Sequence, residues 1–139
     1  MASWEDVATI ASSLPGVDES TSYGNRDWKV SKKTFAWDRP LRKGEVEALG
    51  GFEPEGAAPR GEILAVRVAD EEAKQALLSS EPEIYFATSH FDGYPAVLIR
   101  LERISRAELE EVVTEAWLAR APKRLAAEYL REAGRGWGR

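Results

Sequence analysis

The chain of 139 residues contains no cysteine, a single methionine and a single histidine. Without cysteine it can form no disulfide, no thiolate metal site and no cysteine nucleophile, and this fits a reducing cytosol. It also lacks any apolar run near the roughly 18 residues that a membrane helix needs. Because Met1–Asp6 has neither the basic nor the apolar segment of a signal peptide, we expect a cytoplasmic protein with no membrane partner.

The composition is that of an ordinary globular protein, with 43% hydrophobic and 31% charged residues. A chain of this length is typical of one domain, so residues 1–139 are predicted to form a single domain. Glycines and prolines break the pattern of residues 39–60, which indicates a loop-rich insertion there. The last helix is predicted to end at Gly134, leaving a frayed tail over residues 135–139.

Hydrophobic spacing predicts alternating helices and strands. Trp28, Phe35 and Trp37 recur at strand spacing around Ser31–Lys33, which predicts a hairpin with one apolar face and a basic turn. A second hairpin is predicted around the turn Asp92-Gly93. The remaining predicted elements are a helix near residues 3–13, a strand over 62–68, a helix over 71–79 burying Ala73, Ala76 and Leu77, a helix from Ser105 burying Trp117, and a helix from Pro122. This order predicts an α+β fold, a mostly antiparallel sheet with helices packed on one side.

Charge is unevenly distributed along the chain, whose net charge is −5. Residues 24–44 hold seven basic and two acidic residues, and residues 120–139 hold six basic and two acidic ones. Residues 45–119 are strongly acidic, with sixteen acidic residues against six basic ones. The total charge argues against a nucleic-acid ligand, whereas the two basic segments favour one.

An ordered series of short motifs covers nearly the whole chain. These motifs are Leu14-Pro15-Gly16-Val17, Thr21-Ser22-Tyr23-Gly24, Trp28-Lys29-Val30, Lys33-Thr34-Phe35-Ala36, the segment His90–Leu98 and the segment Glu115–Leu125. Together they resemble the MmcQ/YjbR family, and the form His-Phe-Asp-Gly-Tyr-Pro resembles its actinobacterial branch. The resemblance implies a double-wing, frataxin-like fold and a DNA-binding label that rests on fold similarity. It implies no catalytic residues.

Two binding hypotheses follow, and both describe a non-catalytic module. In the first, a basic hairpin and the basic last helix contact the phosphates of a nucleic acid. The residues of this predicted interface are Lys29, Lys32, Lys33, Arg39, Arg42, Lys43, Lys123 and Arg124. The aromatic residues Trp28, Phe35 and Trp37 would then be either a stacking platform for bases or simply buried core.

In the second hypothesis, a small molecule or a protein partner occupies a pocket lined by Tyr23, His90, Asp92 and Tyr94. An enzyme ranks third, because His90 and Asp92 border a turn and no nucleophile with a recognisable context accompanies them. No catalytic residue is therefore predicted. One histidine and one carboxylate fall short of the three protein ligands of a catalytic zinc, so we predict neither a metal site nor a cofactor.

Overall fold

The computed structural model describes residues 2–137, without the side chains of Ser22 and residues 134–137. Its strands are β1 (Val17–Ser22), β2 (Asn25–Val30), β3 (Lys33–Asp38), β4 (Ile63–Arg67), β5 (Tyr85–Phe86) and β6 (Ala96–Arg100). Its helices are α1 (Trp4–Ser13), α2 (Lys43–Ala48), α3 (Glu71–Ser80), α4 (Arg106–Arg120) and α5 (Lys123–Trp137), with short 3-10 turns η1 (Ser89–Phe91) and η2 (Leu101–Arg103).

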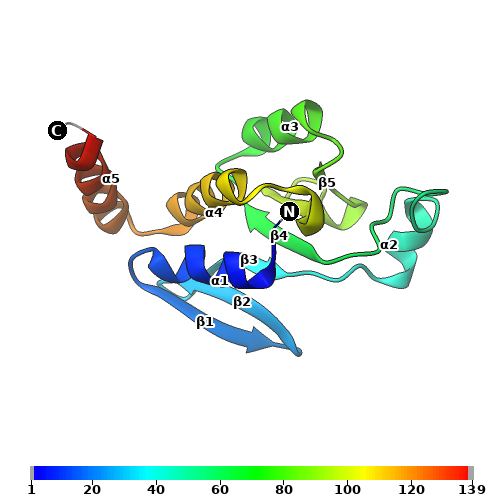
Figure 1. The fold of residues 1–139 in the computed structure, drawn as a ribbon, viewed down its shortest axis with the longest axis horizontal. Helices are drawn as coiled ribbons and strands as arrows, with labels where there is room; N and C mark the ends of the chain where they lie inside the picture. The colour runs from blue at the N-terminus through cyan, green and yellow to red at the C-terminus, as the bar shows by residue number, and fades with distance from the viewer. Residues whose placement is uncertain (1, 138–139) are drawn as a thin grey trace.

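The strands described form a six-stranded sheet in the order β1-β2-β3-β4-β6-β5, with every neighbouring pair antiparallel. Helices α1 and α4 cross one face of this sheet, and α3 packs beside them above β5 and β6 (Figure 1). The predicted α+β class with an antiparallel sheet is confirmed. None of the described helices is both long enough and apolar enough to cross a membrane.

Apolar side chains cover both faces of the central strands. On β4, Leu64 and Val66 belong to the main core under the helices, whereas Ile63 and Ala65 belong to a smaller cluster. Because successive strand residues point to opposite faces, this smaller cluster lies on the face away from α1 and α4. Short turns cover that face instead of long helices, which leaves room there for a cavity.

A β-bulge in the β2–β3 hairpin changes which face of the sheet Trp37 occupies. Trp28 pairs with Ala36 but Lys29 pairs with Thr34, so Phe35 is one extra residue on β3. Phe35 and Ala36 are both fully buried in the main core, and Trp37 therefore joins the opposite cluster. The prediction that Trp28, Phe35 and Trp37 share one face is wrong for Trp37.

The two-residue turn Ser31-Lys32 confirms the predicted hairpin. Both residues have positive φ, 49° and 67°, as a type I′ turn requires. The edge strand β1 was not predicted, because its sequence Val-Asp-Glu-Ser-Thr-Ser has one apolar residue and looks like a loop.

Two local predictions on the other half of the sheet need correction. Gly93, with φ 74°, and Asp92 form the centre of a type II turn closed by the Tyr94 N–H to the Phe91 carbonyl at 3.0 Å. This turn lies inside a long connection between β5 and β6, so it is not a tight hairpin. On α3, Ala76 is exposed, and the residue that is buried is Lys74.

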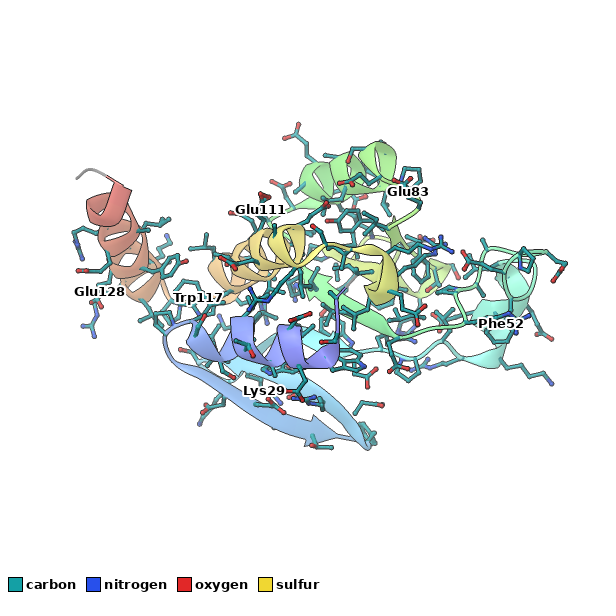
Figure 2. All side chains as sticks on the ribbon, viewed as in Figure 1. Lys29, Phe52, Glu83, Glu111, Trp117 and Glu128 are labelled. Atoms are coloured by element: carbon teal, nitrogen blue, oxygen red, sulfur yellow. The ribbon has the colours of Figure 1, made fainter. Side chains whose placement is uncertain are left out.

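Most helix signals in the sequence are confirmed. The side chains of Ser3, Asp70 and Ser105 cap the starts of α1, α3 and α4. Trp117 is fully buried where α4 meets α1 and the start of α5 (Figure 2), and its indole N–H donates to the Pro15 carbonyl at 3.0 Å. Helix α5 continues past Gly134 to Trp137, and residues 138–139 of the predicted tail lie outside the described residues.

Candidate functional site

A cavity of about 760 Å³ lies on the sheet face opposite α1 and α4. Three segments surround it: the β1–β2 turn with the start of β2, the end of β3 with the chain that follows, and the η1 turn. We call it the sheet-face pocket. Its lining residues are Tyr23, Asn25, Arg26, Asp27, Thr34, Trp37, Asp38, Arg39, Pro40, Leu41, Arg42, His90, Phe91 and Tyr94.

Aromatic rings form much of the pocket. Trp37 stacks on Phe91 with ring centroids 6.4 Å apart and an angle of 29° between the ring planes. Tyr94, which is 42% exposed, lies next to Phe91, with ring centroids 6.1 Å apart. At the rim, Tyr23 is fully exposed on the Tyr23-Gly24 turn. A ring-containing molecule of moderate size would find flat surfaces here.

Glu45 of α2 connects two segments at the pocket, the one that carries Arg39 and the one that carries Thr88. Both of its oxygens accept hydrogen bonds from the Arg39 guanidinium at 2.9 Å, and one also accepts from the Thr88 hydroxyl at 2.6 Å. The Arg39 guanidinium in turn lies over the Phe91 ring, 5.3 Å from its centroid. Burial alone would raise the pKa of Glu45, but these hydrogen bonds and that of the Arg42 N–H lower it to about 2.

Lys74 holds the turn that carries Phe91 and Tyr94. Its side chain is 3% exposed, and its ammonium donates to the Phe91 carbonyl at 2.6 Å and to the Tyr94 carbonyl at 2.9 Å. From the neighbouring strand, Arg67 donates to the Tyr94 hydroxyl at 3.1 Å, with its guanidinium 4.9 Å from the ring centroid. These contacts within the protein therefore fix the position of Phe91 and Tyr94 at the pocket.

The predicted pocket residues are partly brought together. Tyr23, His90 and Tyr94 all line the cavity, whereas Asp92 is exposed outside it. In the part of the chain that the structure describes, no hydrogen bond joins the side chain of His90 or Asp92 to a serine or threonine hydroxyl. Within residues 2–137, no three histidine or acidic side chains are grouped so that they could hold a metal ion.

The predicted nucleic-acid residues divide into separate sets. Lys29 is bound to the nearly buried Asp27 at 3.0 Å, and Arg39 is bound to Glu45, so neither is an exposed free cation. Arg42 and Lys43 are exposed at the start of α2. Trp28 and Phe35 are fully buried, which excludes them from stacking on bases.

The other four cations lie around the turn of the β2–β3 hairpin, at the end opposite to α2. Lys32 and Lys33 are exposed at the β2–β3 turn, and Lys123 and Arg124 are exposed at the start of α5. A side chain at Gly16 would come within 3.3 Å of Leu125 on α5 and 4.0 Å of Val30, which precedes the turn. We call Lys32, Lys33, Lys123 and Arg124 the basic end.

Sequence reasoning missed Trp37, Glu45 and Lys74 as parts of the pocket. The pattern of apolar residues gives no sign of the bulge that places Trp37 on the pocket face. Lys74 was detectable, because it stands three and four residues before Leu77 and Leu78, on the stripe that α3 buries. A lysine in that stripe must find buried acceptors.

The chain combines an antiparallel α+β sheet with a pocket on its helix-free face, and comparison with known proteins gives the family. The family model described as YjbR matches residues 12–119. The chain belongs to the YjbR family. It is 51% identical over 136 residues to the uncharacterized protein Rv2570 of Mycobacterium tuberculosis and equally to Mb2600 of Mycobacterium bovis, which covers 96% of this chain and 100% of each relative.

A solved structure is similar in fold. The crystal structure of Deinococcus radiodurans protein DR2400, whose domain is described as DUF419, superposes with a TM-score of 0.61 over 85% of this chain and 78% of that one. Sequence identity to it is 15%, so the likeness concerns the fold alone.

Proposed function

We propose that this protein is a binding module whose sheet-face pocket takes a small molecule containing a flat ring. The supporting observation is the aromatic group of Trp37, Phe91 and Tyr94 beside a cavity of about 760 Å³. Pockets for small ligands have volumes of roughly 300–1,000 Å³ and combine apolar walls with a few fixed polar groups. The hydrogen bonds of Glu45 and Lys74 hold the pocket walls in place before a ligand binds, which reduces the entropy lost on binding.

Ligand-observed NMR with a library of ring-containing fragments tests this proposal. We expect several fragments to receive saturation from the protein, and Trp37→Ala to abolish these signals, because the ring surface is lost. Phe52→Ala is the matched control, since Phe52 is 43% exposed and lies outside the pocket. Thermal melts of both variants would separate lost binding from lost folding. Equal binding by wild type and the folded Trp37→Ala variant would refute the proposal.

A second candidate function is nucleic-acid binding at the basic end. It is supported by the proximity of the β2–β3 turn to the start of α5, which brings four exposed cations from two distant segments to one end of the sheet. Phosphate contacts of this kind position a protein on a nucleic acid without reading its sequence. The acidic total charge opposes such binding, so attraction would depend on this local cluster.

The salt dependence of binding to DNA and RNA oligonucleotides tests the second candidate. We expect the slope of log affinity against log salt to flatten by about one to two units in the double variant Lys32→Ala/Lys33→Ala. The control is Arg60→Ala/Arg103→Ala, which removes the same charge from two exposed side chains outside the basic end and should leave the slope unchanged. If neither duplex nor single-stranded oligonucleotides bind at low salt, this candidate is refuted.

A further inference from the structure

We propose that the ligand of the sheet-face pocket carries a carboxylate or phosphate group beside its ring, and that Arg42 binds this group. The inference rests on the proposed small-molecule function and specifies its ligand class. It follows from which charged side chains at the pocket already have partners and which do not.

Two of the charged groups on the pocket face are neutralised by neighbours. Asp27 is paired with Lys29 and accepts a hydrogen bond from the Ser20 hydroxyl. Arg39 makes its two-point contact with Glu45. Because each pair is held within the protein, neither gives the pocket a net charge to offer a ligand.

The two other charged lining residues belong to the helix-bearing face of the sheet. Arg26 is paired with Glu19 at 2.9 Å and lies over the core residue Trp28, 5.3 Å from its ring centroid. Asp38 pairs in register with Leu64, whose side chain is in the main core, so its own side chain emerges on that same face.

The surroundings of Asp38 also disfavour its ionised form relative to that of a free carboxyl group. Burial first, and then the nearby Glu62 carboxylate, raise the pKa of Asp38 above its ordinary value. Asp27 is paired with Lys29 and Asp38 emerges on the other face, so a cationic ligand would find no unpaired carboxylate on the pocket face.

Arg42 is the remaining charge. It lines the pocket and is exposed, and its guanidinium has no hydrogen bond or ion pair with any other residue of the described chain. A guanidinium presents planar paired donors that match a carboxylate or a phosphate. Trp37 supplies the flat surface for a ring on the same side of the sheet, so a ring with an attached anion fits both features.

Four naphthalene probes with different substituents test the inference: 2-naphthoate, 2-naphthyl phosphate, 2-naphthylmethanol and 2-naphthylmethylamine. Their dissociation constants would come from titrations that follow the indole N–H of Trp37 in ¹⁵N–¹H correlation spectra. We expect at least one anionic probe to bind roughly 10-fold or more tighter than the alcohol, as a charge-assisted hydrogen bond gives. We expect the amine to bind more weakly than the alcohol. The two anions distinguish carboxylate from phosphate recognition.

Variants assign the preference to one side chain. Arg42→Gln should bring the anionic probe to the affinity of the alcohol, whereas the control Lys43→Gln, an exposed neighbour outside the pocket lining, should keep the preference. Ring binding without an anion preference, or a preference that survives Arg42→Gln, overturns this inference and leaves the pocket function standing. If no probe shifts the Trp37 signal at millimolar concentration, the pocket function itself is overturned.

Discussion

Replacing Lys74 by methionine tests how the aromatic wall of the pocket is held. Lys74 is a buried lysine whose charge is met by two backbone carbonyls, those of Phe91 and Tyr94, at 2.6 and 2.9 Å. Methionine has a similar length and can occupy the same buried space between α3 and the turn. The substitution therefore removes the ammonium and its hydrogen bonds with little change in packing volume.

The expected cost is moderate because both carbonyls keep a second partner. The Phe91 carbonyl still accepts from the Tyr94 N–H at 3.0 Å, and the Tyr94 carbonyl accepts from the Ala96 N–H at 2.8 Å. Hydrogen bonds to charged groups contribute about 1.5–3 kcal/mol each, so two of them amount to roughly 3–6 kcal/mol. The variant also avoids the penalty of burying an ammonium group, and this offsets several kcal/mol of that loss. We expect Lys74→Met to lower the free energy of unfolding by about 1–2 kcal/mol.

Urea denaturation gives the global change, and amide hydrogen exchange locates it. The amides of Phe91–Tyr94 should lose more protection than those of β4 and β6, because the turn alone loses its anchor. A variant as stable as the wild type, or more stable, would refute the reasoning, since burial of the charge would then outweigh its hydrogen bonds. Uniform loss of protection across the sheet would likewise show that Lys74 does not act on the turn.

Three further predictions concern the core, the pH dependence and a turn. Trp117→Ala should cost about 3–5 kcal/mol in denaturant melts because it empties a fully buried site, and a loss below about 1 kcal/mol would contradict that placement. The pKa of Glu45 is about 2 in the folded state against an ordinary 4.5, so the ionised carboxylate contributes at most about 3 kcal/mol to the free energy of unfolding. This contribution is complete above pH 4.5 and disappears as pH falls towards 2. Glu45→Gln should flatten stability measured between pH 7 and 3, and an unchanged profile would refute this. Gly93→Ala should cost roughly 1–2 kcal/mol from its φ of 74° alone, as nothing lies near the added methyl group, and a neutral thermal melt would count against it.

Local signals in the sequence predicted most of the elements. Capping residues such as Ser105 and the buried stripe around Trp117 act within one helix, so a short window of sequence contains the information. The YjbR resemblance, carried by short motifs, is confirmed by the family match. The strand β1 escaped prediction because its stability comes from pairing with β2 and not from its own polar residues.

The candidate site was only partly predictable, because it depends on contacts between distant segments. Tyr23, His90 and Tyr94 were predicted as pocket residues, and the cavity brings these three together without Asp92. Glu45 reaches Thr88, 43 residues away, and no local pattern marks that contact. The basic residues look continuous along residues 24–44, yet their partners in space decide which of them are exposed.

The bulge at Phe35 makes the pairing of β3 as important as its chemistry. Strand residues alternate between faces, so regular pairing of all the residues from Lys33 to Asp38, without the bulge, would turn Trp37 towards the helix-covered core, which is already filled. Deletion of Phe35 would remove the bulge and still leave Ala36 in the core and Trp37 on the pocket face. A one-residue gap at Phe35 in an alignment with a relative is therefore compatible with the same flat wall of the pocket.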